Sequence, residues 1–267
     1  MDVILEVKNL SAGYRSPVVS NVDLQAASGE LVGILGRNGL GKTTLLRGIT
    51  GDARRFSGTV RVCGRDCAGL SVRQQARLMA VLPQKNQIPQ GITGRDILEM
   101  SGYAGGSLWG GVTEKLQGRI CLWAERLKIG ELLDRDCACL SVGQQQMILL
   151  CRLLVQDTPV LLLDEPNAAL DYVNTQAIFH MLKSVLREQG KAAVAVLHDP
   201  QLALQWCDRL LLMENGTVTE TLCPGSMQAE QLTRSLGRLF PGIRVVYDPQ
   251  AGRQFCYTQP ESDIHFL

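Results

Sequence analysis

The sequence has almost no net charge and no long hydrophobic run. Its 27 lysines and arginines nearly balance 26 aspartates and glutamates, which gives a formal net charge of +1. This balance argues against a dedicated nucleic-acid-binding protein, because such proteins usually carry a clear basic excess. A membrane-spanning helix needs about 20 apolar residues, and the best candidate, Met147–Val155, is short and interrupted by Arg152. We therefore expect no membrane span.

Signals for secretion, disulfides and zinc are also missing. The first ten residues, M-D-V-I-L-E-V-K-N-L, carry acidic side chains where a signal peptide would be basic. We therefore expect a cytoplasmic protein. The nine cysteines include the pairs Cys63/Cys67 and Cys137/Cys139, but neither pair has a histidine or a further cysteine at zinc-ligand spacing. We expect reduced thiols, because a chain of this length with 45% hydrophobic residues can bury a core without disulfides.

Apolar segments alternate with helical patterns along much of the chain, which predicts an α/β fold with a parallel sheet. Half-exposed strands are expected at Val3–Val7 and Val18–Leu24, and buried strands at Leu31–Leu35, Val160–Leu163, Ala192–Leu197 and Leu210–Met213. The turn after the last of these, E-N-G, favours a tight hairpin. The middle, from about Ile88 to Val155, is predicted to be a helical insertion, with a loop at Gly102–Gly111.

Two helices follow strands in this pattern. One is predicted after Leu197, from Gln201 to Cys207. A longer amphipathic helix is predicted between Asp171, which can cap its start, and Gly190, which can end it. Its apolar face is predicted to comprise Val173, Ala177, Ile178, Met181, Leu182, Val185 and Leu186.

A glycine-rich turn separates the strand Leu31–Leu35 from a helix that begins near Lys42 and ends at Gly51. Its sequence, G-R-N-G-L-G-K-T from Gly36 to Thr43, fits the P-loop pattern G-x-x-x-x-G-K-[ST]. Glycines let backbone N–H groups approach phosphate oxygens, and the helix N-terminus adds its own N–H groups and dipole. Lys42 is expected to reach the β- and γ-phosphates and Thr43 to bind Mg²⁺. The other reading, an ordinary glycine turn, is disfavoured because the motif lies between a strand and a helix.

Acidic residues end the strand Val160–Leu163, where open α/β sheets bind their ligands. Asp164 is expected to hold Mg²⁺, and Glu165 to polarise an attacking water as a general base. His198 ends the strand Ala192–Leu197, so we expect it at the same edge, in contact with the γ-phosphate. Alternatively, the acids could terminate a strand and the histidine could lie beside a helix cap.

The segment Leu140-Ser141-Val142-Gly143-Gln144 closely resembles the L-S-G-G-Q signature of ATP-binding-cassette (ABC) ATPases. The family's other motifs occur around it in the family's order: Tyr14, the P-loop, Gln84 in V-L-P-Q, the Asp164-Glu165 pair, Ala169-Leu170-Asp171 and His198. One departure is Val142 in place of a glycine. Because a β-branched residue resists positive φ, this position must accept ordinary backbone angles.

The resemblance implies a P-loop NTPase (RecA-like) parallel-sheet core with an N-terminal antiparallel β subdomain and an inserted α-helical subdomain. It also implies a head-to-tail homodimer with two ATP molecules between the subunits. Each ATP would lie on one P-loop under the other subunit's signature. The implied catalytic residues are Lys42, Gln84, Glu165 and His198, and the implied Mg²⁺ ligands are Thr43, Gln84 and Asp164. The implied ATP-binding residues are Tyr14 on adenine, then Gly36, Asn38, Gly39, Gly41, Lys42, Thr43, Thr44, Ser141, Gly143, Gln144 and Asp171.

A single cassette without a membrane span is similar to the separate ATPase subunit of an importer. The segments Val196–Asp199, V-L-P-Q and Asp248–Gly252 resemble subunits that import iron–siderophore, haem or cobalamin. The implied partners are polytopic permease subunits and, indirectly, a substrate-binding protein, with the chain at the inner face of the membrane. The implied division is 1–87 with 159–220 as the nucleotide-binding core, 88–158 as the helical subdomain and 221–267 as an appendage. The alternatives are a soluble ABC ATPase, a nucleotide-binding regulatory module without turnover, or a transporter subunit for another substrate.

Overall fold

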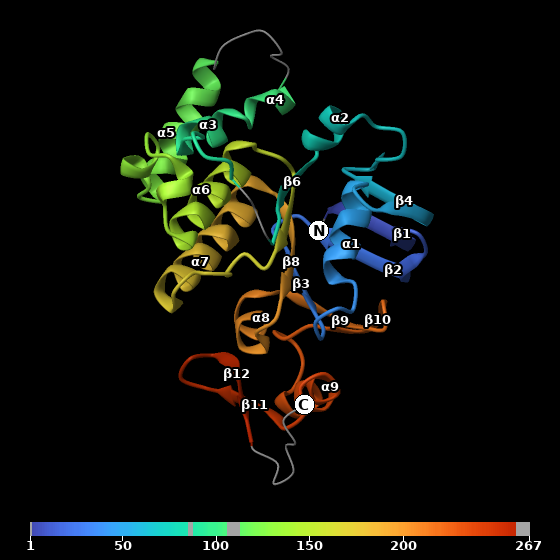
Figure 1. Ribbon diagram of the computed structural model, residues 1–267. Helices are drawn as coiled ribbons and strands as arrows, with labels where there is room; N and C mark the ends of the chain where they lie inside the picture. The colour runs from blue at the N-terminus through green and yellow to red at the C-terminus, as the bar shows by residue number, and fades with distance from the viewer. Residues whose placement is uncertain (1, 85–87, 106–112, 260–267) are drawn as a thin grey trace.

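The computed structural model describes residues 2–84, 88–105 and 113–259. Its centre is a sheet in the order β10-β9-β3-β8-β7-β6 (Figure 1). Five of these strands are parallel, and β10 joins β9 antiparallel through the predicted hairpin. Their bounds are β3 Leu31–Leu35, β6 Met79–Leu82, β7 Val160–Asp164, β8 Ala192–Leu197, β9 Arg209–Glu214 and β10 Thr217–Leu222. The predicted α/β parallel sheet is confirmed.

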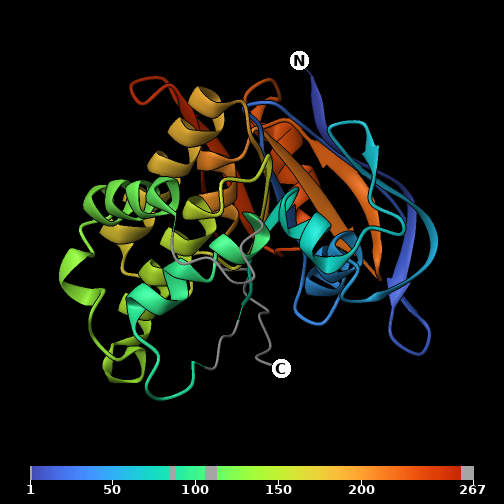
Figure 2. The ribbon, with the colours of Figure 1, turned by 90° about the horizontal axis from the view of Figure 1, so that it is seen from above.

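A second, antiparallel sheet in the order β2-β1-β4-β5 forms the N-terminal β region. Its strands are β1 Val3–Gly13, β2 Pro17–Ala27, β4 Arg54–Val62 and β5 Arg65–Asp66. Helix α1, Lys42–Thr50, lies between this sheet and the central sheet (Figure 2). Alternate residues of β3 therefore serve two cores: Val32 and Ile34 face α1 and the antiparallel sheet, whereas Leu31 and Leu35 belong to the core on the helical side.

The chain between β6 and β7 is helical, as predicted. It comprises α3 Gly94–Glu99, α4 Gly102–Gly105, α5 Glu114–Arg126, two 3₁₀ turns and α6 Val142–Val155. The prediction of a loop over Gly102–Gly111 is wrong for the short helix α4, and 106–112 lie outside the described residues. A five-residue helix, α2 Val72–Ala76, precedes β6.

Helix α7, Tyr172–Gln189, begins after the predicted cap Asp171 and ends at the predicted Gly190, whose φ is 63°. The predicted apolar face is wrong at Val173, which is 74% exposed, and at Ala177, which is also exposed. Phe179 is fully buried instead. The other five predicted positions are buried or partly buried, as predicted.

Helix α8, Pro200–Trp206, follows β8 and is capped by Asp199. Helix α9, Ala229–Gly237, follows β10. Strands β11 Ile243–Asp248 and β12 Arg253–Thr258 form a separate hairpin at the end opposite α2 and α4 (Figure 1). All nine cysteines are free thiols, as expected. Within the described ranges no helix is long and apolar enough to cross a membrane.

Candidate nucleotide-binding site

The P-loop runs from the end of β3 into the first turn of α1. Gly36 lies so close to β9 that a Cβ there would be 2.6 Å from the carbonyl oxygen of Met213. Gly39 and Gly41 have φ values of 80° and 92°, which favour glycine. Gly41 caps α1 without any side-chain hydrogen bond. The first N–H groups of this nine-residue helix are therefore open to an anion, as a phosphate-binding loop requires.

Lys42 is only 6% exposed and points back across this loop. Its ammonium group donates hydrogen bonds to the carbonyl oxygens of Gly36 (2.7 Å) and Arg37 (2.8 Å). Burial lowers the pKa of Lys42, and the charges of Glu165 and Asp164 oppose this shift. The two carboxylates therefore approach the P-loop lysine, although they come from a strand far away in sequence.

Asp164, the last residue of β7, is 3% exposed, and its Oδ1 has no hydrogen-bond partner within the described part of the chain. Burial raises the pKa of this carboxyl, a hydrogen bond from Thr43 opposes the shift, and the Glu165 charge adds to it. An unpartnered buried carboxylate oxygen beside a threonine hydroxyl fits Mg²⁺, which prefers oxygen ligands and takes one or two carboxylates together with phosphate and water. No group of three or more His, Cys, Asp or Glu that could hold a metal occurs in the described ranges.

Glu165 follows β7 with a positive φ of 55°, a conformation that is uncommon for a side-chain-bearing residue. Its Oε1 accepts hydrogen bonds from Nε2 of Gln84 (2.5 Å), just after β6, and lies 2.5 Å from Nε2 of His198, just after β8. Because β6, β7 and β8 are neighbours in the sheet, three residues far apart in sequence meet at the carboxyl edge. The structure thus brings together the P-loop, both acids, the glutamine and the histidine.

The signature residues lie in a different place. Ser141 caps α6, where its hydroxyl accepts from the N–H of Gln144 (3.3 Å) and the Gln144 side chain accepts from the N–H of Ser141 (3.1 Å). Val142 is the first residue of α6, with ordinary helical angles as expected, and is 67% exposed. A Cβ on Gly143 would be 3.0 Å from the carbonyl oxygen of Ala169. No hydrogen bond between the described residues joins this segment to the P-loop of the same chain.

The remaining predicted residues lie on other elements. Tyr14, in the turn between β1 and β2, is 51% exposed, and its hydroxyl accepts a hydrogen bond from Arg47 of α1 (2.9 Å). Asp171 caps α7 by accepting from the N–H of Asn174 (2.7 Å). In the P-loop, Asn38 is exposed, whereas Thr44 is buried in α1.

Sequence reasoning missed Gln146. Its side chain is 8% exposed and donates to the carbonyl oxygen of Pro166 (3.2 Å), which connects α6 to the loop after Glu165. The available signal was an amide next to the apolar run Met147–Leu150, where a buried polar side chain needs a partner.

Comparisons with known proteins agree with this geometry. Residues 19–168 match the ABC transporter family. The chain is 34% identical over 240 residues to the hemin import ATP-binding protein HmuV of Rhodococcus jostii, covering 88% of this chain and 79% of that protein. It is 30% identical to the achromobactin transport ATP-binding protein CbrD of Dickeya dadantii, covering 91% and 90%. The dimeric structure of MJ0796, a bacterial ABC transporter cassette, superposes with a TM-score of 0.74 at 25% identity, covering 82% of this chain and 98% of that one.

The family match spans more than half of the chain and contains the P-loop and the Asp164-Glu165 pair. The relative HmuV aligns over most of its own length. The chain therefore belongs to the ABC transporter family and is an ATP-hydrolysing cassette of the kind that serves as the ATP-binding subunit of importers.

Proposed function

We propose that this chain is the motor subunit of an importer for a metal chelate, working as a head-to-tail dimer on a separate permease. The observation that carries the proposal is the meeting of Gln84 and His198 on one oxygen of Glu165, at the edge that also holds the P-loop and Asp164. This arrangement suits a single reaction, the attack of water on the γ-phosphate of ATP.

The nucleotide binds on the P-loop side of the carboxyl edge of the sheet. The open N–H groups of α1 and the Lys42 ammonium bind the phosphates, and Lys42 exchanges its bonds to the loop carbonyls for phosphate oxygens. Tyr14, held by Arg47, stacks on adenine. Thr43, Asp164 and Gln84 would hold Mg²⁺, which supplies charge neutralisation on the phosphates.

Glu165 is placed to accept a proton from the attacking water. Its Oε1 is engaged by Gln84 and His198, which fix its side chain in one direction. His198 would contact the γ-phosphate, and Gln84 would help to hold Mg²⁺. The carboxylate is then left free to orient water.

The signature segment acts on the other subunit's nucleotide. Ser141, Gly143 and Gln144 start a helix whose dipole is positive at this end, and no acidic residue lies in its first turn. The Gly143 N–H is unobstructed by a side chain, and Asp171 is exposed. These groups would cover an ATP bound to the P-loop of a second copy.

The importer part of the proposal is supported by relatives named for hemin and achromobactin transport. By the same resemblance, the chelate is an iron–siderophore, haem or cobalamin. The partners are polytopic permease subunits and indirectly a substrate-binding protein, but no nucleic acid, and the chain docks on the inner face of the membrane. We also propose the division into a core (1–87 and 159–220), a helical subdomain (88–158) and an appendage (221–267).

A glutamine at position 165 tests the catalytic assignment. Glu165→Gln keeps a side chain that can accept from Gln84 but removes the base, so ATP turnover should fall about 10²–10⁴-fold while ATP still binds. Gel filtration with ATP should then show a trapped dimer. The matched control is Glu188→Gln, which neutralises an exposed glutamate in the last turn of α7. Turnover at the normal rate in the Glu165 variant would overturn its role as base.

Transport is tested separately. Expressed with its chromosomal neighbours, the tagged chain should co-purify with a polytopic membrane protein, and the chelate should stimulate ATP turnover of the complex when its binding protein is added. A chain that hydrolyses ATP but recovers no membrane partner would favour the soluble ABC ATPase instead.

A further inference from the structure

Helix α6 leads from the signature at its start to the base of the helical subdomain at its end. At about 1.5 Å per residue, its 14 residues, Val142–Val155, span about 21 Å. A turn of about 5° at the base would therefore displace the signature by about 2 Å. Because a shift of about 1 Å can lower a reaction rate about 100-fold, the direction of α6 matters for any phosphate that the signature has to reach.

Polar contacts hold the base of α6 to the core. The Gln156 amide, directly after the helix, donates to the carbonyl oxygens of Ala76 (2.7 Å) and Met79 (3.3 Å), at the end of α2 and the start of β6. Asp157 follows with a positive φ of 56°. Its Oδ1 accepts a hydrogen bond from the ammonium group of Lys191 (2.6 Å), which lies between α7 and β8. The chain that leaves α6 is thus fixed to three elements of the core.

Asp157 also holds the neighbouring helix. Its Oδ2 accepts from the Arg119 guanidinium (3.2 Å), in the middle of α5, and α5 packs against α6 (Figure 1). One carboxylate therefore joins α5, the end of α6 and the core, with a separate oxygen for each cation. Among the ion pairs between described residues, Asp157–Lys191 is the only one that joins the helical subdomain to the core.

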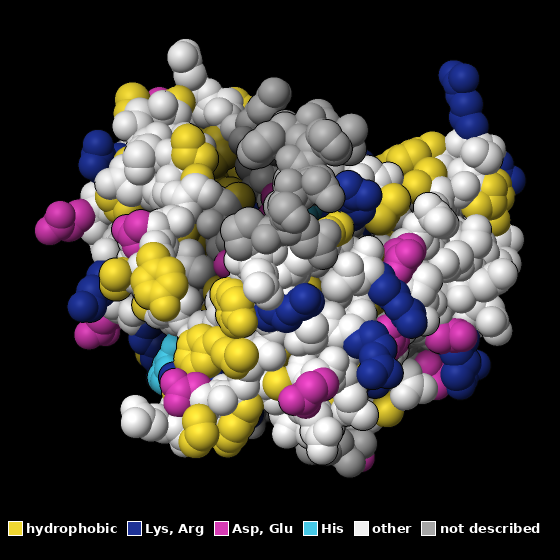
Figure 3. Space-filling view, turned by 90° about the horizontal axis from the view of Figure 1, so that it is seen from below, with side chains coloured by type: hydrophobic (Ala, Val, Ile, Leu, Met, Phe, Trp, Pro, Cys, Tyr) yellow, Lys and Arg dark blue, Asp and Glu magenta, His cyan; other side chains and the backbone are white. Residues whose placement is uncertain are grey.

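Burial distinguishes this ion pair from the charges on the surface. Figure 3 shows acidic and basic side chains scattered over one face of the molecule, and exposed ion pairs contribute little to stability. Lys191, in contrast, is 7% exposed, so loss of its partner would leave a buried ammonium group without a counter-ion. Burial acts to raise the pKa of the Asp157 carboxyl, but the hydrogen bonds and charges of Lys191 and Arg119 lower this pKa overall, so the carboxyl stays ionised at neutral pH.

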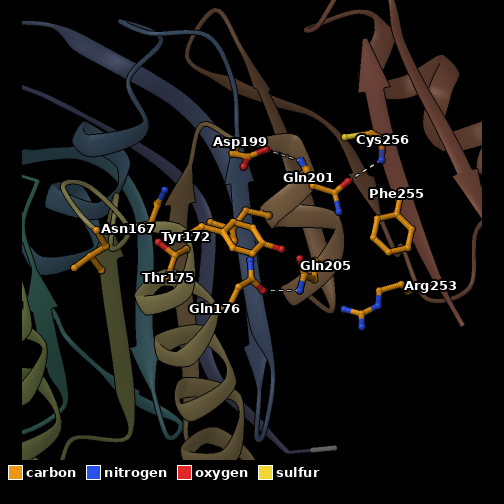
Figure 4. A pocket seen from close by; sticks show the side chains of 12 residues that line it. Asn167, Tyr172, Thr175, Gln176, Asp199, Gln201, Gln205, Arg253, Phe255 and Cys256 are labelled. Carbon is orange, nitrogen blue, oxygen red and sulfur yellow. Dashed lines mark hydrogen bonds between the residues drawn. The ribbon is translucent and has the colours of Figure 1, made fainter. Parts of the chain in front are cut away.

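The core side of this contact is well anchored. Lys191 follows α7, and the first half of α7 is tied down beside a hollow of about 510 Å³ between α7, α8 and β12 (Figure 4). There the Gln176 side chain of α7 accepts from the Gln205 amide of α8 (2.6 Å). The Gln201 side chain of α8 accepts in turn from the backbone N–H of Cys256 in β12 (2.7 Å). Lys191 therefore extends from an element that is fixed to its neighbours.

We propose that Asp157 is a positioning residue, which aligns the helical subdomain so that the signature of one copy meets the ATP of the other. The proposal rests on the head-to-tail dimer proposed above. Gln146 fixes the first half of α6 through the carbonyl oxygen of Pro166, and Asp157 fixes its end, so the direction of the helix is set at two points. Asp157 precedes β7, whereas the nucleotide edge lies at the opposite end of that strand. It therefore acts through alignment and not on the nucleotide.

The test uses the full chain carrying Glu165→Gln, with ATP present. Asp157→Asn keeps the size of the side chain and suits the positive φ, but it accepts with only one oxygen and turns an NH₂ group toward a donor. The matched control is Asp134→Asn, which neutralises one member of an exposed pair with Arg95 (2.8 Å) inside the helical subdomain. Sedimentation should show a dimer dissociation constant raised at least about tenfold by Asp157→Asn and less than about twofold by the control.

Nucleotide binding to the single chain separates alignment from general damage. A fluorescent ATP analogue, measured at dilutions at which the chain is monomeric, should bind the parent and both variants with equal affinity, because the P-loop lies in the core. A loss of analogue binding in Asp157→Asn that matches its loss of dimer would overturn the positioning role, since damage to the whole fold would then explain both.

Arg119→Gln tests the second cation. It should also weaken the dimer, and the double variant should be no weaker than Asp157→Asn alone, because both changes remove the same link. Additive losses, or equal dissociation constants in Asp157→Asn and the control, would overturn the proposal while the ATP-dependent dimer stands. A parent Glu165→Gln chain that stays monomeric with ATP would instead refute the head-to-tail dimer itself, and the positioning role with it.

Discussion

The chain contains the same helix cap twice, which allows the function of the signature to be separated from its contribution to stability. Leu70-Ser71-Val72-Arg73-Gln74-Gln75 begins α2, and Leu140-Ser141-Val142-Gly143-Gln144-Gln145 begins α6. In both, the serine hydroxyl accepts from the N–H of the glutamine three residues later at 3.3 Å, and the side-chain oxygen of that glutamine accepts from the serine N–H. The next glutamine donates to the leucine carbonyl at 3.2 Å in both copies.

Replacing either capping serine by alanine removes one of these bonds. Each of Ser71→Ala and Ser141→Ala should therefore cost about 1 kcal/mol of unfolding free energy, within about 0.5–2. In a chain of this size the melting temperature should fall by roughly 2–4 °C. The cost should be similar at both sites, because the capping bonds match in partner and length, and the one difference is a 3.1 Å hydrogen bond from the Ser71 hydroxyl to Oε1 of Gln74.

Activity should separate the two variants. If the Ser141 hydroxyl also meets the γ-phosphate held by a second copy, its loss removes a bond to a charged group worth about 1.5–3 kcal/mol. That corresponds to a fall of about 10–150-fold in kcat/KM for ATP, whereas Ser71→Ala should stay within about twofold of wild type. Thermal unfolding and steady-state phosphate release measure the two effects. Similar losses of activity in both variants would refute the reasoning, because destabilisation alone would then explain them.

Two further predictions concern residues at the carboxyl edge of the sheet. Because the pKa of the Asp164 carboxyl is raised, the folded chain holds the carboxyl proton more tightly than the unfolded chain does. Ionisation of this carboxyl therefore lowers the free energy of unfolding as the pH rises from about 4 through the raised pKa. Asp164→Asn should therefore raise the melting temperature at pH 7 while Mg²⁺-dependent ATP turnover falls at least about 100-fold; a lower melting temperature would contradict it. Gly36→Ala places a methyl group 2.6 Å from the Met213 carbonyl oxygen and should cost about 1–3 kcal/mol in urea unfolding. Gly118→Ala, in exposed helix with open space, should instead stabilise by up to about 1 kcal/mol, and a matching loss at both glycines would argue against a steric cause.

Local patterns predicted much of the fold because they depend on neighbours in sequence. The P-loop glycines, the cap Asp171 and the end of α7 at Gly190 follow from backbone geometry and helix-end hydrogen bonds, and the structure has them as predicted. Strand β4 was not predicted, since its five-residue run Arg54–Gly58 is mostly exposed and polar. It forms because β1, about 50 residues earlier, offers an antiparallel partner.

The contacts of Glu165 were less accessible to sequence reasoning. The sequence shows that Asp164, Glu165 and His198 lie at the ends of buried strands. Whether these side chains meet depends on the order of the strands in the sheet. The order β8-β7-β6 brings His198, Glu165 and Gln84 together on one oxygen. A different pairing of the same strands would separate them, because only hydrogen-bonded neighbours lie about 5 Å apart.

The two L-S-V-x-Q-Q segments show the same division between local and tertiary information. The sequence by itself determines that both start a helix, since the capping box is completed by residues three apart. Tertiary structure decides which of the two can serve as the signature that we propose. Helix α6 is 14 residues long, packs its apolar side chains into the core and brings Gly143 against the Ala169 carbonyl, whereas α2 has five residues and none of them is buried. The function that we propose for Ser141 thus depends on burial of the helix that follows, and no local pattern at the cap encodes that burial.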